Sequence, residues 1–212
     1  MDGTARRARL ARARLCLVIE AHPDVATLLE AALRGGVDVV QLRDKELADA
    51  GLVAAARVFR RVCDAHGALF VLNDRPDLVE ACGADGVHVG QEDAPLAEAR
   101  AAVGADRLVG VSTGSPAEME AAAGADYLGV GTVFSTPTKA DGSAVGLELV
   151  RAAAAAVTVP WFAIGGIDLA NVGLVAEAGA RGVAVVRAIR DADDPEGAAR
   201  ALRAALGEPP PA

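Results

Sequence analysis

Short segments rich in valine, leucine and isoleucine alternate with alanine-rich amphipathic segments along the 212-residue chain. Apolar runs of this length are typical of buried parallel strands, and each amphipathic segment can form the helix that returns the chain to the next strand. The expected strands are residues 15–19, 37–42, 68–72, 86–89, 108–111, 127–130, 161–164 and 183–186. The expected helices are residues 25–34, 50–66, 75–82, 95–103, 116–123, 147–156, 169–178 and 195–206.

Three of the helix-to-strand junctions repeat one phrase, Gly-Ala followed by Asp or Arg, within residues 82–86, 123–127 and 178–182. A glycine at this place ends a helix in a left-handed conformation, and the repetition indicates that one strand–helix unit recurs. Eight such units in about 200 residues favour a compact (β/α)8 TIM barrel. The alternative is an open doubly wound sheet, which usually carries a glycine-rich dinucleotide turn after its first strand; residues 20–23 are not such a turn.

The expected organisation is one barrel domain over residues 15–207. Residues 1–14, with five arginines and no long apolar run after them, are expected to be a disordered basic extension, and the proline-rich residues 208–212 a disordered tail. Three isolated cysteines and the lack of a long uncharged apolar run favour a cytoplasmic protein with buried thiols. A net charge of −8 argues against nucleic acid or a membrane surface as partner. The sequence leaves open whether the chain forms a homo-oligomer.

The active site of such a barrel lies where the strands end, so the residues that follow each apolar run are the candidates. After the second run, alternation places Gln41, Arg43 and Lys45 on the same side. Arg43 can hold a phosphate through two hydrogen bonds, Lys45 adds a point charge, and the Gln41 amide can read the edge of a heterocycle. The alternative is a solvated loop in which Asp44 pairs with its neighbours.

Two carboxylates follow the third and fourth apolar runs, Asp74 and Asp93. Because neighbouring strands lie about 4.8 Å apart, carboxylates at both ends can converge on one Mg²⁺ ion. Each aspartate also stands shortly before a proline, so each could instead cap the helix that follows.

The loop at residues 131–142 follows the sixth apolar run and combines hydroxyl side chains with Lys139 between flanking glycines. Its hydroxyl and backbone N–H groups could wrap a phosphorylated ligand, and Lys139 could follow a departing anion. An ordinary solvated loop is the alternative, since threonine, glycine, proline and lysine are common in turns.

The remaining strand ends carry further polar or flexible groups. Ser112 could donate to a phosphate at the barrel mouth, and Gly165 and Gly166 would let a phosphate approach backbone N–H groups. Asp168 would cap the helix after them. His88 lies within a strand, where a histidine is usually a satisfied interior group rather than a catalytic acid or base.

Taken in order, five of these motifs resemble those of the thiamine phosphate synthase family: residues 40–45, 72–75, 88–93, 136–139 and 164–167. The resemblance extends from about Leu15 to Leu206. It implies a TIM barrel that joins hydroxymethylpyrimidine pyrophosphate to a thiazole phosphate, with Mg²⁺, and releases pyrophosphate. In that family the pyrimidine methylene loses pyrophosphate to give a stabilised cation, which the thiazole nitrogen captures, so no strong protein base is required.

The resemblance also implies a role for each matching residue. It implies pyrimidine contact for Gln41, pyrophosphate binding for Arg43, Lys45, Asn73, Ser112 and Lys139, Mg²⁺ binding for Asp74 and Asp93, and thiazole phosphate binding for Thr136, Thr138, Gly166 and the backbone near Val186. Lys139, Arg43, Lys45 and Ser112 would be the catalytic members of this set.

The chain departs from the family pattern at Gly114, where the family often has a histidine after the Ser-Thr pair, and at Arg187, where the family frequently has a serine. A related thiazole tautomerase depends on that histidine, so Gly114 disfavours this alternative. A phosphate-binding barrel isomerase would need a paired acid and base, for which only Glu92 or His88 would serve. A non-catalytic ligand-binding relative would have no need for the carboxylate pair and the cations.

Overall fold

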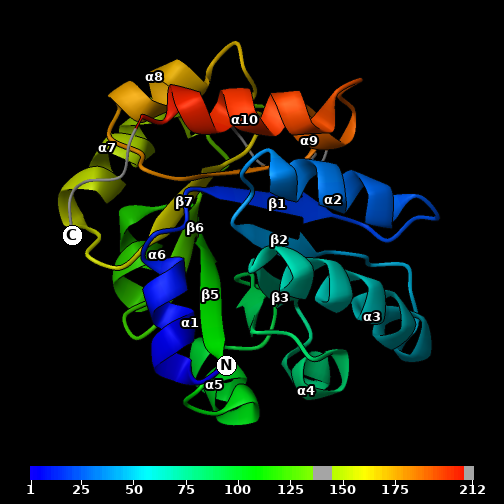
Figure 1. Ribbon diagram of the computed structural model, residues 1–212. Coiled ribbons are helices and arrows are strands. Elements are labelled where there is room, and N and C mark those ends of the chain that lie inside the picture. The colour runs from blue at the N-terminus through cyan, green and yellow to red at the C-terminus, as the bar shows by residue number, and fades with distance from the viewer. Residues whose placement is uncertain (136–144, 208–212) are drawn as a thin grey trace.

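The computed structural model describes residues 1–135 and 145–207, which form a closed barrel of parallel strands in the order β1 to β8 (Figure 1). The strands are β1 (Leu15–Ile19), β2 (Val39–Leu42), β3 (Leu69–Asn73), β4 (Gly86–Val89), β5 (Leu108–Thr113), β6 (Tyr127–Val130), β7 (Trp161–Ile164) and β8 (Val183–Val185). Pairing of β1 with β8 closes the barrel. The (β/α)8 barrel predicted from the repeat is therefore confirmed, and the open sheet is excluded.

The helices run outside the barrel and bring each strand back parallel to the last (Figure 1). They are α2 (Val25–Arg34), α3 (Asp49–His66), α4 (Val79–Cys82), α5 (Leu96–Val103), α6 (Pro116–Ala121), α7 (Gly146–Ala156), α8 (Val172–Glu177) and α10 (Pro195–Ala205). A 3-10 turn, η1 (Pro76–Leu78), precedes α4, so the single helix expected over residues 75–82 is divided into two short pieces. Two helices were not expected from the sequence, α1 (Gly3–Leu10) and α9 (Arg187–Arg190).

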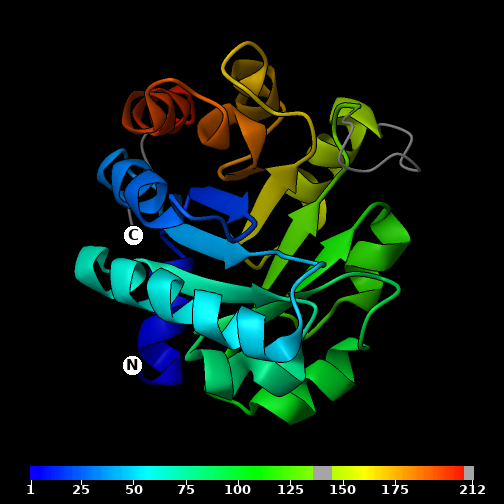
Figure 2. The same cartoon turned by 90° about the vertical axis from the view of Figure 1, so that its right-hand side faces the viewer.

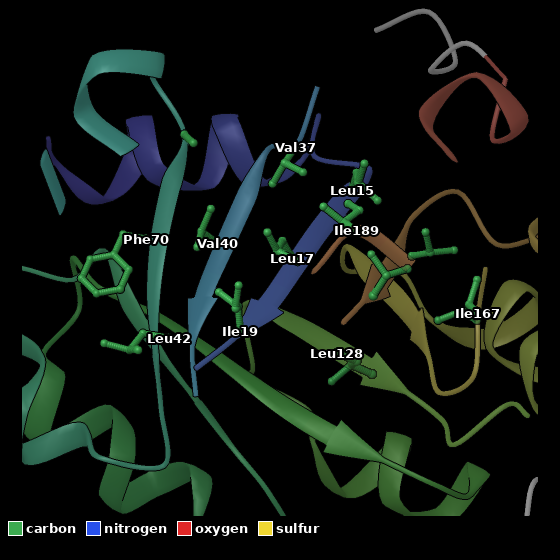
Figure 3. Packing of buried hydrophobic residues seen from close by; sticks show 14 of the residues in the cluster. Leu15, Leu17, Ile19, Val37, Val40, Leu42, Phe70, Leu128, Ile167 and Ile189 are labelled. Carbon is green, nitrogen blue, oxygen red and sulfur yellow. The ribbon is translucent and has the colours of Figure 1, made fainter. Parts of the chain in front are cut away.

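Alternate residues of each strand face two different apolar layers. Leu15, Leu17 and Ile19 pack outward against the helices, as Figure 3 shows along β1. The residues between them, Cys16 and Val18, face the barrel interior, which is filled by side chains of seven of the strands and by Leu10 from α1. The barrel is thus a packed core rather than a pore, and only the strand ends are open to a ligand.

The prediction that residues 1–14 are a disordered extension is wrong. Asp2 caps α1 by accepting a hydrogen bond from the backbone N–H of Ala5 at 2.8 Å, and Leu10 is 1% exposed against the interior layer. Figure 2 shows α1, in dark blue, at the end of the barrel opposite the strand arrowheads. Arg6 reaches a buried partner, with its Nε 3.0 Å from Oδ1 of Asp85. An arginine-rich segment becomes ordered because carboxylates at this end of the barrel accept its charges.

The repeated Gly-Ala-Asp phrase belongs to the same end of the barrel. Oδ2 of Asp85 accepts the backbone N–H of Phe70 at 3.0 Å, and Oδ2 of Asp126 accepts that of Val109 at 2.8 Å. Each aspartate therefore ties the junction before one strand to the backbone of its neighbour. At the third copy Arg181 replaces the aspartate, and its carbonyl accepts a hydrogen bond from a side chain of the N-terminal segment. The repeat is a structural device, remote from the mouth.

The three cysteines are free and buried, as predicted. Burial raises the pKa of Cys16 and of Cys63 to about 12, so both remain neutral thiols. Among the described residues, no helix combines the length and apolar character needed to span a membrane. The predicted tail, residues 208–212, lies outside the described residues.

Candidate active site

The mouth of the barrel begins with polar side chains that continue the inward-facing rows of β2 and β3. Gln41 follows the interior residue Val39 on β2 and is 6% exposed. Arg43 lies two residues further on, where its backbone N–H donates to the carbonyl of Ile19 at 2.9 Å. Asn73 ends β3 on the same interior face. The alternation predicted from the sequence therefore brings these polar groups to one opening.

The loop after β2 is organised by Asp44. Its carboxylate accepts backbone N–H groups of Ala21, Glu46 and Leu47 at 3.1–3.3 Å, so this aspartate holds the backbone rather than pairing with the flanking cations. Lys45 reaches across to the end of β3, where its Nζ lies 3.6 Å from Oδ2 of Asp74. The alternative of a solvated loop in which Asp44 pairs with its neighbours is therefore correct only in part: Lys45 is more than half exposed, but Asp44 binds backbone N–H groups.

Asp74 has a left-handed backbone conformation, with φ of 61°, which aspartate tolerates better than most residues. Its N–H donates to the carbonyl of His88 on β4 at 2.8 Å, which fixes this turn beside the end of that strand. Burial and the neighbouring Asp93 raise the pKa of Asp74 to about 6, although Lys45 and Arg43 act in the opposite direction. Two cations and a second carboxyl group therefore surround this side chain.

Neither aspartate caps a helix. The turn η1 begins without a side-chain hydrogen bond to its N-terminus, and so does α5. Asp93 instead folds back on its own loop, where Oδ2 accepts the N–H of Gly90 at 2.7 Å. Asp74 and Asp93 are within hydrogen-bonding reach of each other, as the pKa of Asp74 reflects. The capping alternative from the sequence is wrong for both.

The carboxylate pair fits a hard cation. Mg²⁺ prefers oxygen ligands and usually takes only one or two carboxylates, with water and phosphate oxygens at its other positions. Within residues 1–135 and 145–207 there is no group of three or more histidine, cysteine or acidic side chains that could hold a metal. Two acidic groups that share a partly buried site, one with a raised pKa, would both be stabilised as carboxylates by a bound divalent cation.

Ser112 is the next-to-last residue of β5, on the interior side, and belongs to a small polar network. Its Oγ lies 2.9 Å from Nε2 of His88, and Nδ1 of that ring lies 3.1 Å from the hydroxyl of Tyr127. The Ser112 carbonyl accepts a hydrogen bond from the side-chain amide of Gln91 at 2.6 Å. His88 is a satisfied interior group, as the sequence indicated. The roles of Tyr127 and Gln91 in this network were not predicted. A tyrosine within an apolar run looks like an ordinary core residue.

After β7 the backbone is held close to the loop that follows β6. Gly165 and Gly166 have φ of 110° and 62°, and a Cβ atom at either would lie 2.5–2.8 Å from side chains of Thr132 or Phe134. Packing thus requires glycine here whether or not a phosphate approaches. Asp168 does not cap α8, because that helix begins four residues later; its Oδ1 accepts the N–H of Ala170 instead.

The remaining predicted residues divide into two groups. Val186 directly precedes α9 at the end of β8, so its backbone lies at the same end of the barrel as the other candidates. Thr136, Thr138 and Lys139 lie outside the described residues. His22 was missed: its Nε2 is buried without a hydrogen-bond partner among the described residues, in the loop after β1.

Comparison with known proteins adds relatives across the whole barrel. A family model described as thiamine monophosphate synthase matches residues 15–189. The chain is 53% identical over 191 residues to the thiamine-phosphate synthase of Gloeobacter violaceus, which covers 89% of this chain and 56% of that relative. It is 52% identical over 206 residues to the thiamine-phosphate synthase of Streptomyces avermitilis, which covers 94% of this chain and 95% of the relative.

A solved structure of thiamine phosphate pyrophosphorylase from Pyrococcus furiosus superposes with a TM-score of 0.84 at 32% identity, over 94% of this chain and 97% of that one. The chain thus spans little more than half of the Gloeobacter relative and almost all of the other two.

Proposed function

The chain belongs to the thiamine monophosphate synthase family, and we propose that it joins hydroxymethylpyrimidine pyrophosphate to a thiazole phosphate, forming thiamine phosphate and pyrophosphate. The observation that carries this proposal is the gathering of charges at the barrel mouth, where Asp74 lies beside Lys45, Arg43 and Asp93. A substitution that expels pyrophosphate needs such a mixture: cations for the anion that leaves, and carboxylates for a divalent cation.

Asp74 and Asp93 would hold Mg²⁺. When bound, this ion supplies positive charge that neutralises the diphosphate oxygens. Lys45 would turn from Asp74 toward the diphosphate, since an exposed ion pair at 3.6 Å is worth less than about 1 kcal/mol and is readily exchanged.

The side chains of the mouth would then orient the first substrate. The amide of Gln41 would hydrogen-bond the pyrimidine edge, which fixes the methylene carbon, and Arg43 would grip the diphosphate through two hydrogen bonds. Asn73 and Ser112 would donate to other diphosphate oxygens. As the C–O bond breaks, its electron pair leaves with pyrophosphate, and the pyrimidine stabilises the resulting cation. These residues accelerate the step because they are in place before the charge develops.

The second substrate would bind opposite, at the ends of β7 and β8. The backbone N–H groups near Gly166 and Val186 would bind the thiazole phosphate together with Thr136 and Thr138. The thiazole nitrogen would use its lone pair to form the new C–N bond. It carries no proton to be removed, so no general base is needed, and Lys139 would accompany the departing pyrophosphate.

The tautomerase alternative is disfavoured because Gly114 stands where that type of enzyme depends on a histidine, and the surroundings of Gly114 do not themselves require glycine. A Cβ atom there would meet its nearest neighbour, the carbonyl oxygen of Gly131, at 3.4 Å, and φ is not left-handed. A larger residue could therefore be accommodated, so the absence of a titrating side chain is not imposed by packing. A non-catalytic relative that binds the same ligands is the outcome against which the proposal is tested.

The test is to mix both heterocyclic substrates with Mg²⁺ and to measure thiamine phosphate and pyrophosphate. We expect product from the wild-type chain, and a loss of about 100-fold or more in the Asp74→Asn variant. Asp77→Asn is the matched control. Asp77 is an exposed aspartate on η1 that pairs with Arg75 and does not belong to the Asp74–Asp93 pair. Absence of product from folded wild-type protein would favour the binding protein. The cytoplasmic location stays a prediction, and the oligomeric state stays open.

A further inference from the structure

Three polar side chains form a continuous line from the barrel interior to the mouth: Tyr127, His88 and Ser112. The tyrosine hydroxyl lies 3.1 Å from Nδ1 of His88, and Nε2 of the same ring lies 2.9 Å from Oγ of Ser112. Tyr127 and His88 are 4% and 9% exposed, whereas Ser112 is only half-buried. The line therefore connects the dry interior with the place where the diphosphate is proposed to bind.

Two glycines make room for this line and fix where its members lie. A Cβ atom at Gly110 would be 2.1 Å from the Tyr127 ring, and one at Gly129 would be 3.2 Å from Cε1 of His88. On its other side, the tyrosine ring meets Phe162 edge-on, with ring centroids 5.9 Å apart. The two rings are thus held by packing on the interior face, so the direction of their hydrogen bonds is the remaining variable.

The chemistry of the tyrosine decides that direction. Burial raises the pKa of Tyr127 well above its usual value, so the phenol keeps its proton. Among the described residues the tyrosine hydroxyl has one hydrogen-bond partner, the His88 ring, and a buried hydroxyl that fails to donate is destabilising. Nδ1 of His88 is the acceptor placed to receive this proton. A neutral imidazole that accepts at Nδ1 carries its own proton on Nε2.

The consequence reaches Ser112. An Nε2–H group donates to the serine oxygen, so the serine hydrogen is not used in that contact and is free to turn toward the mouth. The opposite arrangement, in which the serine donates to Nε2 and Nδ1–H donates to the tyrosine, would occupy the serine hydrogen within the protein. The Ser112 carbonyl accepts a hydrogen bond from Gln91, which fixes the serine backbone, so the two arrangements differ only in where the protons of the tyrosine, the imidazole and the serine hydroxyl lie.

We propose that His88 is a positioning residue: Tyr127 holds it as the Nε2–H tautomer, and it directs the Ser112 hydroxyl to donate to a diphosphate oxygen of the bound substrate. The inference rests on the proposed function and adds to it the reason why a single serine hydroxyl can serve as a preorganised donor. A donor oriented before the charge develops stabilises the transition state more than one that must reorient.

The tautomer is measured directly, without substrate, by ¹⁵N NMR of the imidazole side chains at a pH where they are neutral. The chain has three histidines, so the His88 signals are assigned by their loss in the His88→Gln variant. We expect a protonated Nε2 and an unprotonated Nδ1. A protonated Nδ1 would overturn the proposal, because the serine hydrogen would then be held by the ring.

The kinetic test compares two amides at this position. Glutamine can place its NH₂ group near the position of Nε2 and donate to Ser112, whereas asparagine is shorter and reaches only the tyrosine side. We expect His88→Asn to lower kcat about tenfold with little change in KM, and His88→Gln to stay within about threefold of wild type. Equal losses in both variants, at equal thermal stability, would contradict the proposal. His66→Asn, at the exposed end of α3, is the control.

A double-mutant cycle separates this role from simple packing. Because His88 acts through Ser112, adding His88→Asn to Ser112→Ala should cost less than about a further twofold. Additive losses would overturn the positioning role while leaving the proposed function intact. A wild-type chain that makes no thiamine phosphate would instead overturn the proposed function, and the NMR result would still decide the tautomer.

Discussion

Leu10 on α1 offers a sharp test of how the barrel is closed at the end where its strands begin. This residue is 1% exposed and packs against the interior side chains of the barrel floor, although it belongs to a helix of only eight residues. A helix of that length is marginal in isolation, so its order depends on docking. Replacing Leu10 with alanine removes the main apolar contact between α1 and the barrel interior, and it leaves the arginine contacts of α1 in place.

The expected loss follows from the burial. Leucine-to-alanine substitutions at buried sites cost about 2–5 kcal/mol, and the lower half of that range applies where the surroundings can relax. α1 can shift toward the space left behind, so we expect the free energy of unfolding to fall by about 2–3 kcal/mol. Turnover should remain within about twofold of wild type under native conditions, because the strand ends that carry the candidate site lie at the other end of the barrel.

Urea denaturation of wild type, Leu10→Ala and the control Leu174→Ala measures these differences. Leu174 is 49% exposed on α8, and its substitution should change stability by less than about 0.5 kcal/mol. Hydrogen exchange in the α1 amides should also be faster in Leu10→Ala. If both variants were equally stable, or if the α1 amides exchanged freely in the wild type, tertiary contacts would not be what orders the N-terminal segment.

Three further predictions concern the interior and the mouth. Gly110→Ala should lower the free energy of unfolding by about 3 kcal/mol in thermal or urea unfolding, because its Cβ would lie 2.1 Å from the ring of Tyr127. Gly114→Ala should change it by less than about 0.5 kcal/mol. Equal effects of the two substitutions would contradict the close contact between Gly110 and Tyr127. The raised pKa of Asp74, about 6 against an ordinary 3.8, favours folding below pH 4, and this contribution is lost as the pH rises through 6. In EDTA, Asp74→Asn should therefore be about 1–2 kcal/mol more stable than wild type at pH 7 and equal to it near pH 4, and a gap independent of pH would refute this. Lys139→Ala should lower kcat about 100-fold in the product assay, and near wild-type turnover by a folded variant would remove Lys139 from the mechanism.

Parallel topology explains why the charged part of the site could be predicted. Once the alternating segments indicate a barrel, the ends of all strands meet at one opening, so Arg43, Asp74 and Asp93 are expected there from their positions alone. The structure brings them together as expected. What the pattern could not decide was whether each aspartate caps a helix, because aspartate before proline suits both roles. The left-handed turn at Asp74 and the loop contact of Asp93 decided that.

The sequence by itself predicted the order of the eight strands, the helices that connect them and the barrel, because periodicity and topology are carried by neighbouring residues. Tertiary structure alone decided the order of α1, since Arg6 finds its carboxylate 79 residues away and nothing local signals that contact. It also decided the line that joins Tyr127 and Ser112 to His88, from 39 and 24 residues away. A polar residue on an apolar strand has no visible partner until the barrel closes, and closure is what gives each of these groups its hydrogen bond.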